Sequence, residues 1–236
     1  MRGMSRPGCL LGIFLSVGVA SAAEITFTLE NVGVQPITPV FVAVHDGTFD
    51  MFDEGAAASL ELEAIAEAGD TAPMELLAAG EAGVLSFDVG DFIAPGESTT
   101  LTLTTDLAHP YLSFAAMLPM TNDAFIGLAP GDDALDLYRL GMPMFYDFTL
   151  SYLEVWDAGT EVNTESADDV PGMGGSGSPD EGGVITKPHP GILGVGDVGP
   201  EFDFFGLDVA RVTVIPEPAA LSLLALAGLA LLRTRR

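Results

Sequence analysis

The sequence of 236 residues contains one cysteine and very little positive charge. The cysteine, Cys9, lies near the N-terminus, so the remaining chain has no disulfide, no thiolate metal site and no cysteine nucleophile. Without such cross-links the fold must be held by a hydrophobic core, and about 190 residues between the terminal segments are enough to form one.

Lysine and arginine together number 8, against 34 aspartate and glutamate residues and a formal net charge of −26. Between residues 24 and 215 the only bases are Arg139, Lys187 and Arg211, against 33 acids. A field of this sign repels nucleic acid and anionic lipid and attracts cations. We therefore expect no nucleic-acid partner, and we expect divalent ions or salt to relieve the self-repulsion.

Catalytic motifs are also scarce. His45, His109 and His189 lie far apart and form no zinc-binding spacing, and Gly175–Pro179 does not fit the nucleophile-elbow pattern of serine hydrolases. No glycine-rich phosphate loop precedes a helix. The sequence does not exclude a carboxylate pair for glycoside hydrolysis, because among 33 acids some pair falls at the required separation by chance. We expect a protein that is not an enzyme, with a secreted polysaccharide hydrolase as the alternative.

The sequence patterns of the two ends indicate targeting segments. Residues 1–23 combine Arg2 and Arg6 with a short apolar run and an Ala20-Ser21-Ala22 cleavage pattern, which predicts a signal peptide. Residues 216–236 combine Pro216-Glu217-Pro218, an apolar run of about 21 Å as a helix, and terminal arginines.

The order of these three parts resembles the PEP-CTERM sorting signal of Gram-negative bacteria that make exopolysaccharide. That resemblance implies transient retention in the inner membrane, removal of the tail by an exosortase, and a final place on the cell surface or in the extracellular matrix. The alternative is a plain tail anchor.

Between the ends, strand patterns recur. Residues 25–30 alternate apolar and polar side chains, residues 40–44 are apolar on both faces, and residues 144–155 form a long strand that changes face midway. Two short helices are predicted over residues 57–68 and 73–79. The pattern predicts an all-β fold, an antiparallel β-sandwich spanning residues 24–215. Residues 166–199, rich in glycine and proline, are expected to form a long, partly mobile loop within it.

The segment from Tyr152 to Glu165 begins as a strand with the single tryptophan and ends in a loop rich in oxygen ligands. It carries no basic residue, and its ligand-bearing side chains are Asp157, Thr160, Glu161, Asn163 and Glu165. Crowded carboxylates repel one another unless a cation or water separates them, and calcium takes six to eight oxygen ligands. The loop is either part of a calcium site or a solvated acidic loop.

Four landmarks in order resemble the spondin N-terminal domain: His45-Asp46-Gly47, Ile65–Gly69, the stretch Leu118–Leu128, and Asp157-Ala158-Gly159-Thr160-Glu161. The resemblance spans roughly residues 25–214. It implies a β-sandwich similar to C2 domains, with calcium at one end and a role in matrix and cell adhesion. It also implies that Asp123, Asp157 and Glu161 are calcium ligands.

Two departures limit this resemblance. The cysteines of animal members are absent, and Ala124-Phe125 stands where the family has Trp-Phe, so animal partners are not transferred. The stretch His45-Asp46-Gly47 is either a simple turn or, through Asp46, the source of a further calcium ligand. The sequence thus predicts a secreted, calcium-stabilised binding module for extracellular polysaccharide or a surface protein.

Overall fold

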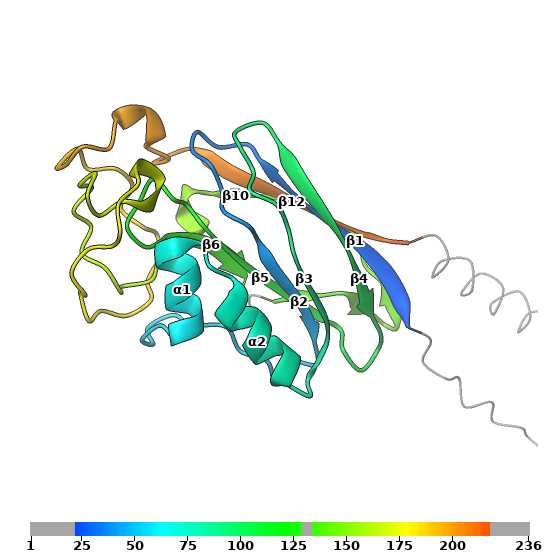
Figure 1. Ribbon diagram of the computed structural model, residues 1–236. Helices are drawn as coiled ribbons and strands as arrows, with labels where there is room; N and C mark the ends of the chain where they lie inside the picture. The colour runs from blue at the N-terminus through cyan, green and yellow to red at the C-terminus, as the bar shows by residue number, and fades with distance from the viewer. Residues whose placement is uncertain (1–21, 129–133, 218–236) are drawn as a thin grey trace, which may run out of the picture.

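The computed structural model describes residues 22–128 and 134–217 (Figure 1). These residues form an antiparallel β-sandwich, as predicted, with two helices packed on the outside of one sheet. Figure 1 shows three layers, in which the sheet containing β2 and β5 lies between the helices and the other sheet.

The first sheet has four antiparallel strands. Its order is β10 (Tyr146–Ser151), β12 (Asp208–Pro216), β1 (Ala23–Asn31) and β4 (Ser98–Thr105). Strands β1 and β4 alternate between buried apolar and more exposed polar residues, so one face packs inward and the other faces solvent.

The second sheet contains the strands that position the candidate site. Its order is β11 (Val155–Asp157), β6 (Ala124–Leu128), β5 (Tyr111–Met117), β2 (Phe41–His45) and β3 (Val84–Val89), with β7 (Leu135–Asp136) also paired to β5. A separate small hairpin joins β8 (Tyr138–Arg139) to β9 (Met142–Pro143).

Two apolar layers fill the fold. The main core lies between the sheets and includes Phe27 and Phe114, whose rings are 5.5 Å apart. The other lies between the second sheet and helices α1 (Leu60–Ala68) and α2 (Ala72–Gly80). Because β2 contributes to both layers, all five of its residues are buried, which is the central position predicted for residues 40–44.

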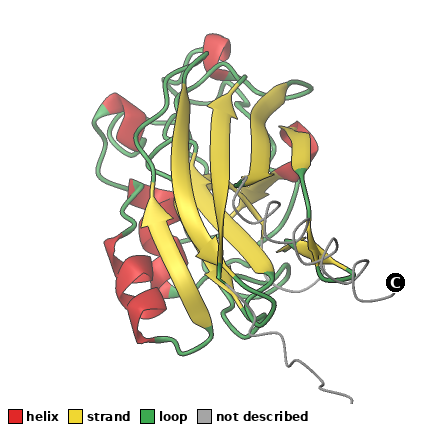
Figure 2. Ribbon diagram, turned by 90° about the vertical axis from the view of Figure 1, so that its right-hand side faces the viewer, coloured by secondary structure: helices red, strands yellow, loops and turns green. Residues whose placement is uncertain are grey.

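Helix α1 starts later than predicted because of its cap. The Ser59 side chain accepts a hydrogen bond from the Leu62 N–H (3.2 Å), so the helix begins at Leu60 and not at Ala57. It ends where Gly69 takes the left-handed conformation, with φ of 64°. Figure 2 shows the two longer helices to one side of the strands.

The prediction of a single long strand over residues 144–155 is wrong. Strand β10 ends at Ser151, a short 3-10 helix covers Tyr152–Glu154, and β11 begins in the other sheet at Val155. The Ser151 and Glu154 side chains form a reciprocal capping box that fixes this crossing. The change of face seen in the sequence is therefore a change of sheet.

The Gly/Pro-rich segment 166–199 is a loop within the domain, and burial anchors it more than its composition suggested. Val170, Ile185 and Val198 are buried, and isolated bridges pair Thr186 with Asp157 and Asp180 with Glu161. Short 3-10 helices lie within it at Pro171–Met173 and just after it at Pro200–Phe202. These contacts hold the loop against the segment from Asp157 to Glu161.

Most of the predicted terminal signals lie outside the described residues. Of the predicted leader, only Ala22 and Ala23 are described. Pro216 ends β12, and the Glu217 N–H donates to the Glu24 carbonyl (2.9 Å), whereas Pro218 and the apolar tail lie beyond the described part. Among the described residues no helix has the length and hydrophobicity needed to cross a membrane.

Candidate metal centre

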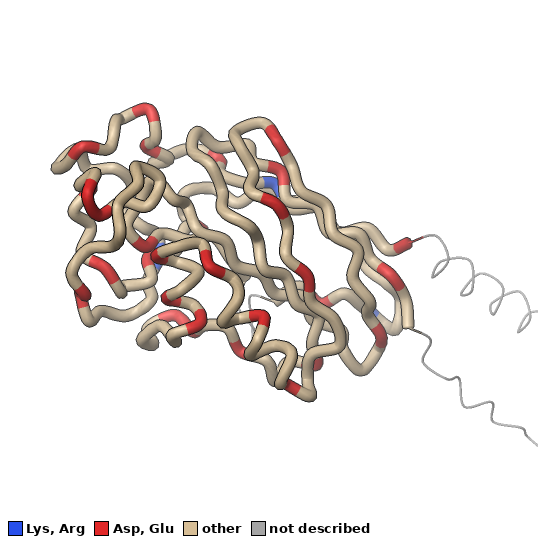
Figure 3. Tube along the Cα trace, in the orientation of Figure 1, with Lys and Arg blue, Asp and Glu red and all other residues tan. Residues whose placement is uncertain are grey.

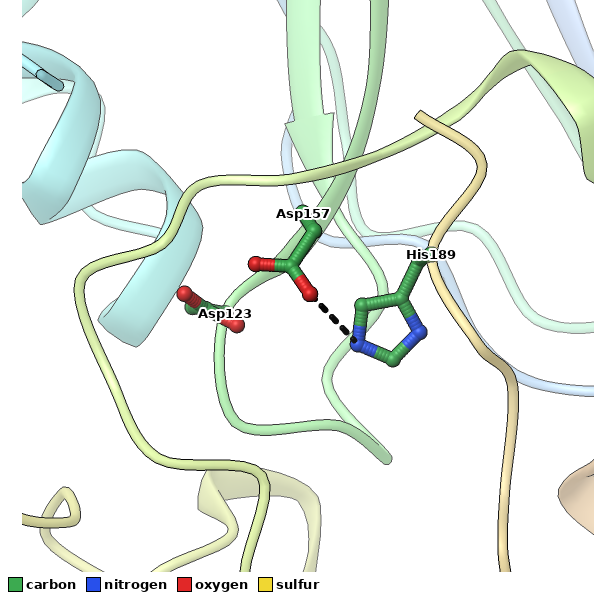
Figure 4. Close-up of side chains that lie close together, drawn as sticks. All are labelled: Asp123, Asp157 and His189. Atoms are coloured by element: carbon green, nitrogen blue, oxygen red, sulfur yellow. Dashed lines mark ion pairs between the residues drawn. The ribbon is translucent and has the colours of Figure 1, made fainter. Parts of the chain in front are cut away.

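Strand pairing brings Asp123 and Asp157 together. Asp123 directly precedes β6, Asp157 ends β11, and the antiparallel register sets Asp157 opposite Ala124. His189 joins them from the Gly/Pro-rich loop, because its N–H donates to the Val155 carbonyl (2.9 Å). One side-chain ligand atom from each of the three residues lies within 4.8 Å of the others (Figure 4).

A tight polar turn fixes Asp123. The Thr121 hydroxyl donates to the Leu118 carbonyl (2.6 Å) and accepts from the Ala124 N–H (3.0 Å). The Ala124 carbonyl accepts from the Leu118 N–H (2.8 Å) and so closes the turn. The Thr-Asn-Asp stretch between two apolar strands is thus a rigid connection that holds one carboxylate at the sheet edge.

The Asp123 carboxylate is fully buried, at 0 % exposure, and only half of it is hydrogen-bonded. Its Oδ2 accepts from the N–H groups of Thr160 (2.9 Å) and Glu161 (3.1 Å) and from the Thr160 hydroxyl (3.4 Å). Its Oδ1 has no hydrogen-bond partner among the described residues. Burial, and then the charge of Asp157, raise the pKa of Asp123 from 3.8 to about 7.

Asp157 is held from both sides. Its Oδ1 accepts from the Gly159 N–H (2.9 Å), and its Oδ2 accepts from the side-chain amide of Asn163 (3.2 Å). The other end of that amide, Asn163 Oδ1, is 3.1 Å from His189 Nε2. These contacts form a chain from His189 through Asn163 to Asp157, and they fix the orientation of the carboxylate.

The hydrogen bonds of His189 also fix its tautomer. Its Nδ1 accepts from the Gly191 N–H (3.1 Å), so the proton of the neutral ring sits on Nε2 and donates to Asn163. Burial lowers the pKa of His189 and keeps the ring neutral. Nε2 therefore has no lone pair for a metal, and His189 orients Asn163 and Asp157 without serving as a ligand.

Glu161, the third predicted ligand, takes a different place. It reaches Asp123 through its backbone N–H, while its carboxylate Oε1 accepts from the Ser178 N–H (2.6 Å). Glu161 is 3 % exposed, and its Oε2 has no partner among the described residues. Burial raises its pKa to about 7, and the charge of Glu67 adds to the effect. Its carboxylate does not join the Asp123–Asp157–His189 group.

Asp46 lies apart from this group. It follows β2 in an exposed turn, where its carboxylate accepts from the N–H (2.9 Å) and hydroxyl (2.7 Å) of Thr48. The turn interpretation of His45-Asp46-Gly47 therefore describes the local structure. Sequence reasoning missed His189, which it set aside on spacing alone. His189 follows the exposed Pro188 in the Gly/Pro-rich loop, and this position carries no recognisable ligand signal.

The site sits in a strongly acidic molecule. Figure 3 shows acidic residues spread over the whole trace and very few basic ones. The arrangement offers two carboxylates, and one of their oxygens, the buried Asp123 Oδ1, has no partner among the described residues. Such a set of hard oxygen donors suits a hard divalent cation better than a thiolate- or imidazole-preferring one.

Comparison with curated proteins finds no match to the chain. Comparison with family models matches Spondin_N over residues 34–170. The matched region includes Asp123, Asp157 and Glu161 and the strands that position them. His189 and strand β12 lie beyond it. Since the match covers more than half of the 236 residues, the chain belongs to the Spondin_N family.

Proposed function

We propose that the protein is a non-enzymatic, exported binding module whose loop end is ordered by a calcium ion held by Asp123 and Asp157. Membership of the Spondin_N family indicates an extracellular protein of the adhesion or binding type. The observation that carries the calcium proposal is the buried carboxylate of Asp123, which lies beside the carboxylate of Asp157 and whose Oδ1 has no hydrogen-bond partner among the described residues.

A cation fits this position on physical grounds. A buried carboxylate oxygen without a partner costs free energy, and the adjacent Asp157 charge raises that cost. A divalent ion would offset both, and it would relieve part of the self-repulsion of a chain with a net charge of −26. Backbone carbonyls and water would complete the shell, since calcium takes six to eight oxygens. Glu161 supports the site through its backbone N–H, which donates to Asp123 Oδ2.

Calcium should be tested by thermal unfolding of the exported chain in millimolar calcium and in chelator. At 100 times its Kd, a bound ion stabilises by about 2.7 kcal/mol, which for a domain of this size corresponds to roughly 5 to 10 °C. Asp157→Ala should abolish the shift, while Asp91→Ala, an exposed aspartate, should preserve it. No shift in the wild type, or an unchanged shift in Asp157→Ala, rejects the site.

For targeting, we propose a leader over residues 1–23 and a PEP-CTERM tail over 216–236 that an exosortase removes, leaving the domain on the surface or in the matrix of a Gram-negative bacterium. The support is the order of Pro216-Glu217-Pro218, the apolar run and the terminal arginines. Mass spectrometry of the native protein gives both termini. A C-terminus at Arg236 in secreted material would reject removal of the tail.

A secreted polysaccharide hydrolase is the second candidate, and one feature favours it. A cavity of about 240 Å³ lies beside Thr160 and Gly159, and Glu63, Glu67 and Asp180 line it. Burial raises the pKa of Glu67, as a general acid requires. Asp123 itself is fully buried and beyond the reach of a substrate. New reducing ends from a polysaccharide panel, lost in Glu67→Gln, would establish the hydrolase and reject the binding module.

A further inference from the structure

The solvent-facing side of the four-stranded sheet carries a contiguous group of threonines. On β1 and β4 the register places Thr26 opposite Thr102 and Thr28 opposite Thr100. On β12 Thr213 lies opposite Thr28, and the exposed Ile215 lies opposite Thr26. Thr100 and Thr102 are exposed, and the other three threonines are half-buried. We call these five threonines the threonine face.

Charge is excluded from the centre of this face although the molecule is acidic. The charged side chains on the same side of the sheet border this group. Glu30 pairs in register with Arg211, which forms a two-point ion pair with Asp147 (2.7 Å for both contacts), and Asp147 lies opposite Thr213. At the other end Glu24 lies opposite Thr104. At the other margin the Thr26 hydroxyl donates to Glu217. The β propensity of threonine accounts for its presence on strands, but not for five uncharged neighbours in a chain with 34 acids.

The geometry of the sheet turns these side chains into a regular array of hydroxyl and methyl groups. Neighbouring strands lie about 4.8 Å apart, and residues on one face recur about every 6.7 Å along a strand. Thr28 Oγ1 and Thr100 Oγ1 are 3.1 Å apart, so these hydroxyls already form one row. Each hydroxyl has one donor and two acceptor positions, which leaves capacity for a ligand.

The side chains of the threonine face indicate which kind of partner it can bind. The face has none of the aromatic or arginine anchors that dominate protein–protein interfaces, and it has no base for phosphate or carboxylate groups. Without an acid at its centre, it is also a poor site for a polycation. A flat polymer with alternating hydroxyl and C–H groups matches it, because the hydroxyls can exchange hydrogen bonds and the methyl groups can pack on sugar rings.

We propose that the threonine face binds a neutral polysaccharide, a polymer of uncharged sugar units laid across β4, β1 and β12. This names the ligand surface of the binding module proposed above and rests on that function. The surface belongs to the first sheet and the calcium centre to the edge of the second, so the two proposals involve different residues.

The test measures depletion of the full chain from solution by microcrystalline cellulose, with dextran, alginate and chitosan as soluble neutral, anionic and cationic competitors. The variant Thr100→Val with Thr102→Val removes two exposed hydroxyls and keeps shape and strand preference. Thr149→Val, on the same sheet beside the charged margin, is the matched control. Thermal unfolding of each variant confirms that the fold is retained.

We expect the wild type to bind, dextran to compete, and added salt to leave binding unchanged, since no charge is involved. The double variant should bind roughly tenfold more weakly, as expected for two lost hydrogen bonds, with the control unaffected. Three results would overturn the inference: no cellulose binding that dextran displaces, salt-sensitive binding displaced only by chitosan, or a self-association that the double variant abolishes. Binding that persists in chelator, without any calcium-induced shift in melting, would reject only the calcium proposal.

Discussion

Replacing Asp123 by asparagine should stabilise the calcium-free protein at neutral pH and also remove its response to calcium. The amide oxygen of asparagine can still accept from the Thr160 and Glu161 N–H groups, which now bind Asp123 Oδ2. Its NH₂ group would take the place of Oδ1, which has no partner among the described residues, and the side chain beside Asp157 would then carry no charge. One substitution therefore relieves the buried charge and destroys the ligand.

The magnitude follows from the pKa of Asp123. A pKa raised from 3.8 to about 7 means that the folded state holds the proton more tightly than the unfolded state, by roughly 4 kcal/mol. Stability from this group is complete below pH 3.8 and is lost as the pH rises toward 7. Above pH 7 without calcium, the Asp123→Asn variant should exceed the wild type by up to this amount, and at pH 4 the two should converge.

The measurement is urea unfolding in chelator from pH 4 to 8, followed by the fluorescence of Trp156, which is buried and donates to the Gly127 carbonyl (3.1 Å). The exposed Asp91→Asn is the control for a general change in charge. In millimolar calcium the gap should narrow, by up to about 2.7 kcal/mol at 100 times the Kd, because only the wild type binds the ion. Parallel pH profiles for wild type and Asp123→Asn would refute the claim that this buried carboxylate carries the pH dependence.

Three further substitutions test the surroundings of the site. His189→Gln removes the ring that orients Asn163, and we expect weaker calcium binding, measured by titration calorimetry, and a loss of about 1 to 3 kcal/mol in unfolding free energy. Glu165→Gln weakens a buried carboxylate that accepts three backbone N–H groups of the 193–196 loop, so limited proteolysis should cut that loop faster. Gly159→Ala should lower the melting temperature sharply, because φ is 67° and the new Cβ would lie 2.6 Å from the Val184 carbonyl oxygen.

Much of the sandwich could be predicted because local pattern and final structure agree. The alternation of residues 25–30 became β1, and the apolar run at residues 40–44 became the central β2. The predicted strand over 144–155 failed because periodicity shows a change of face but not which sheet each half joins.

Part of the candidate site, its two aspartates, could be predicted for a similar reason. Asp123 and Asp157 adjoin two strands with clear signals, and the pairing of those strands brings the carboxylates together. His189 comes from a Gly/Pro-rich segment that pairs with β11 through backbone hydrogen bonds, and composition gives no signal for such pairing. Glu161 was assigned correctly to the neighbourhood but not to a role, since spacing does not reveal whether a backbone or a carboxylate reaches the site.

The placement of His189 explains why a loop of this composition is retained against the site. A carboxylate beside another buried carboxylate would turn away unless held, and Asn163 holds Asp157 from the side of the loop. Asn163 could equally present either end of its amide, and the Nε2–H of His189 selects the orientation in which the NH₂ faces Asp157. Because Gly191 fixes that tautomer, the loop determines the geometry of two carboxylates it does not itself supply. For the calcium site proposed above, we therefore expect ordering of this loop and binding of the ion to be one coupled equilibrium, in which each favours the other.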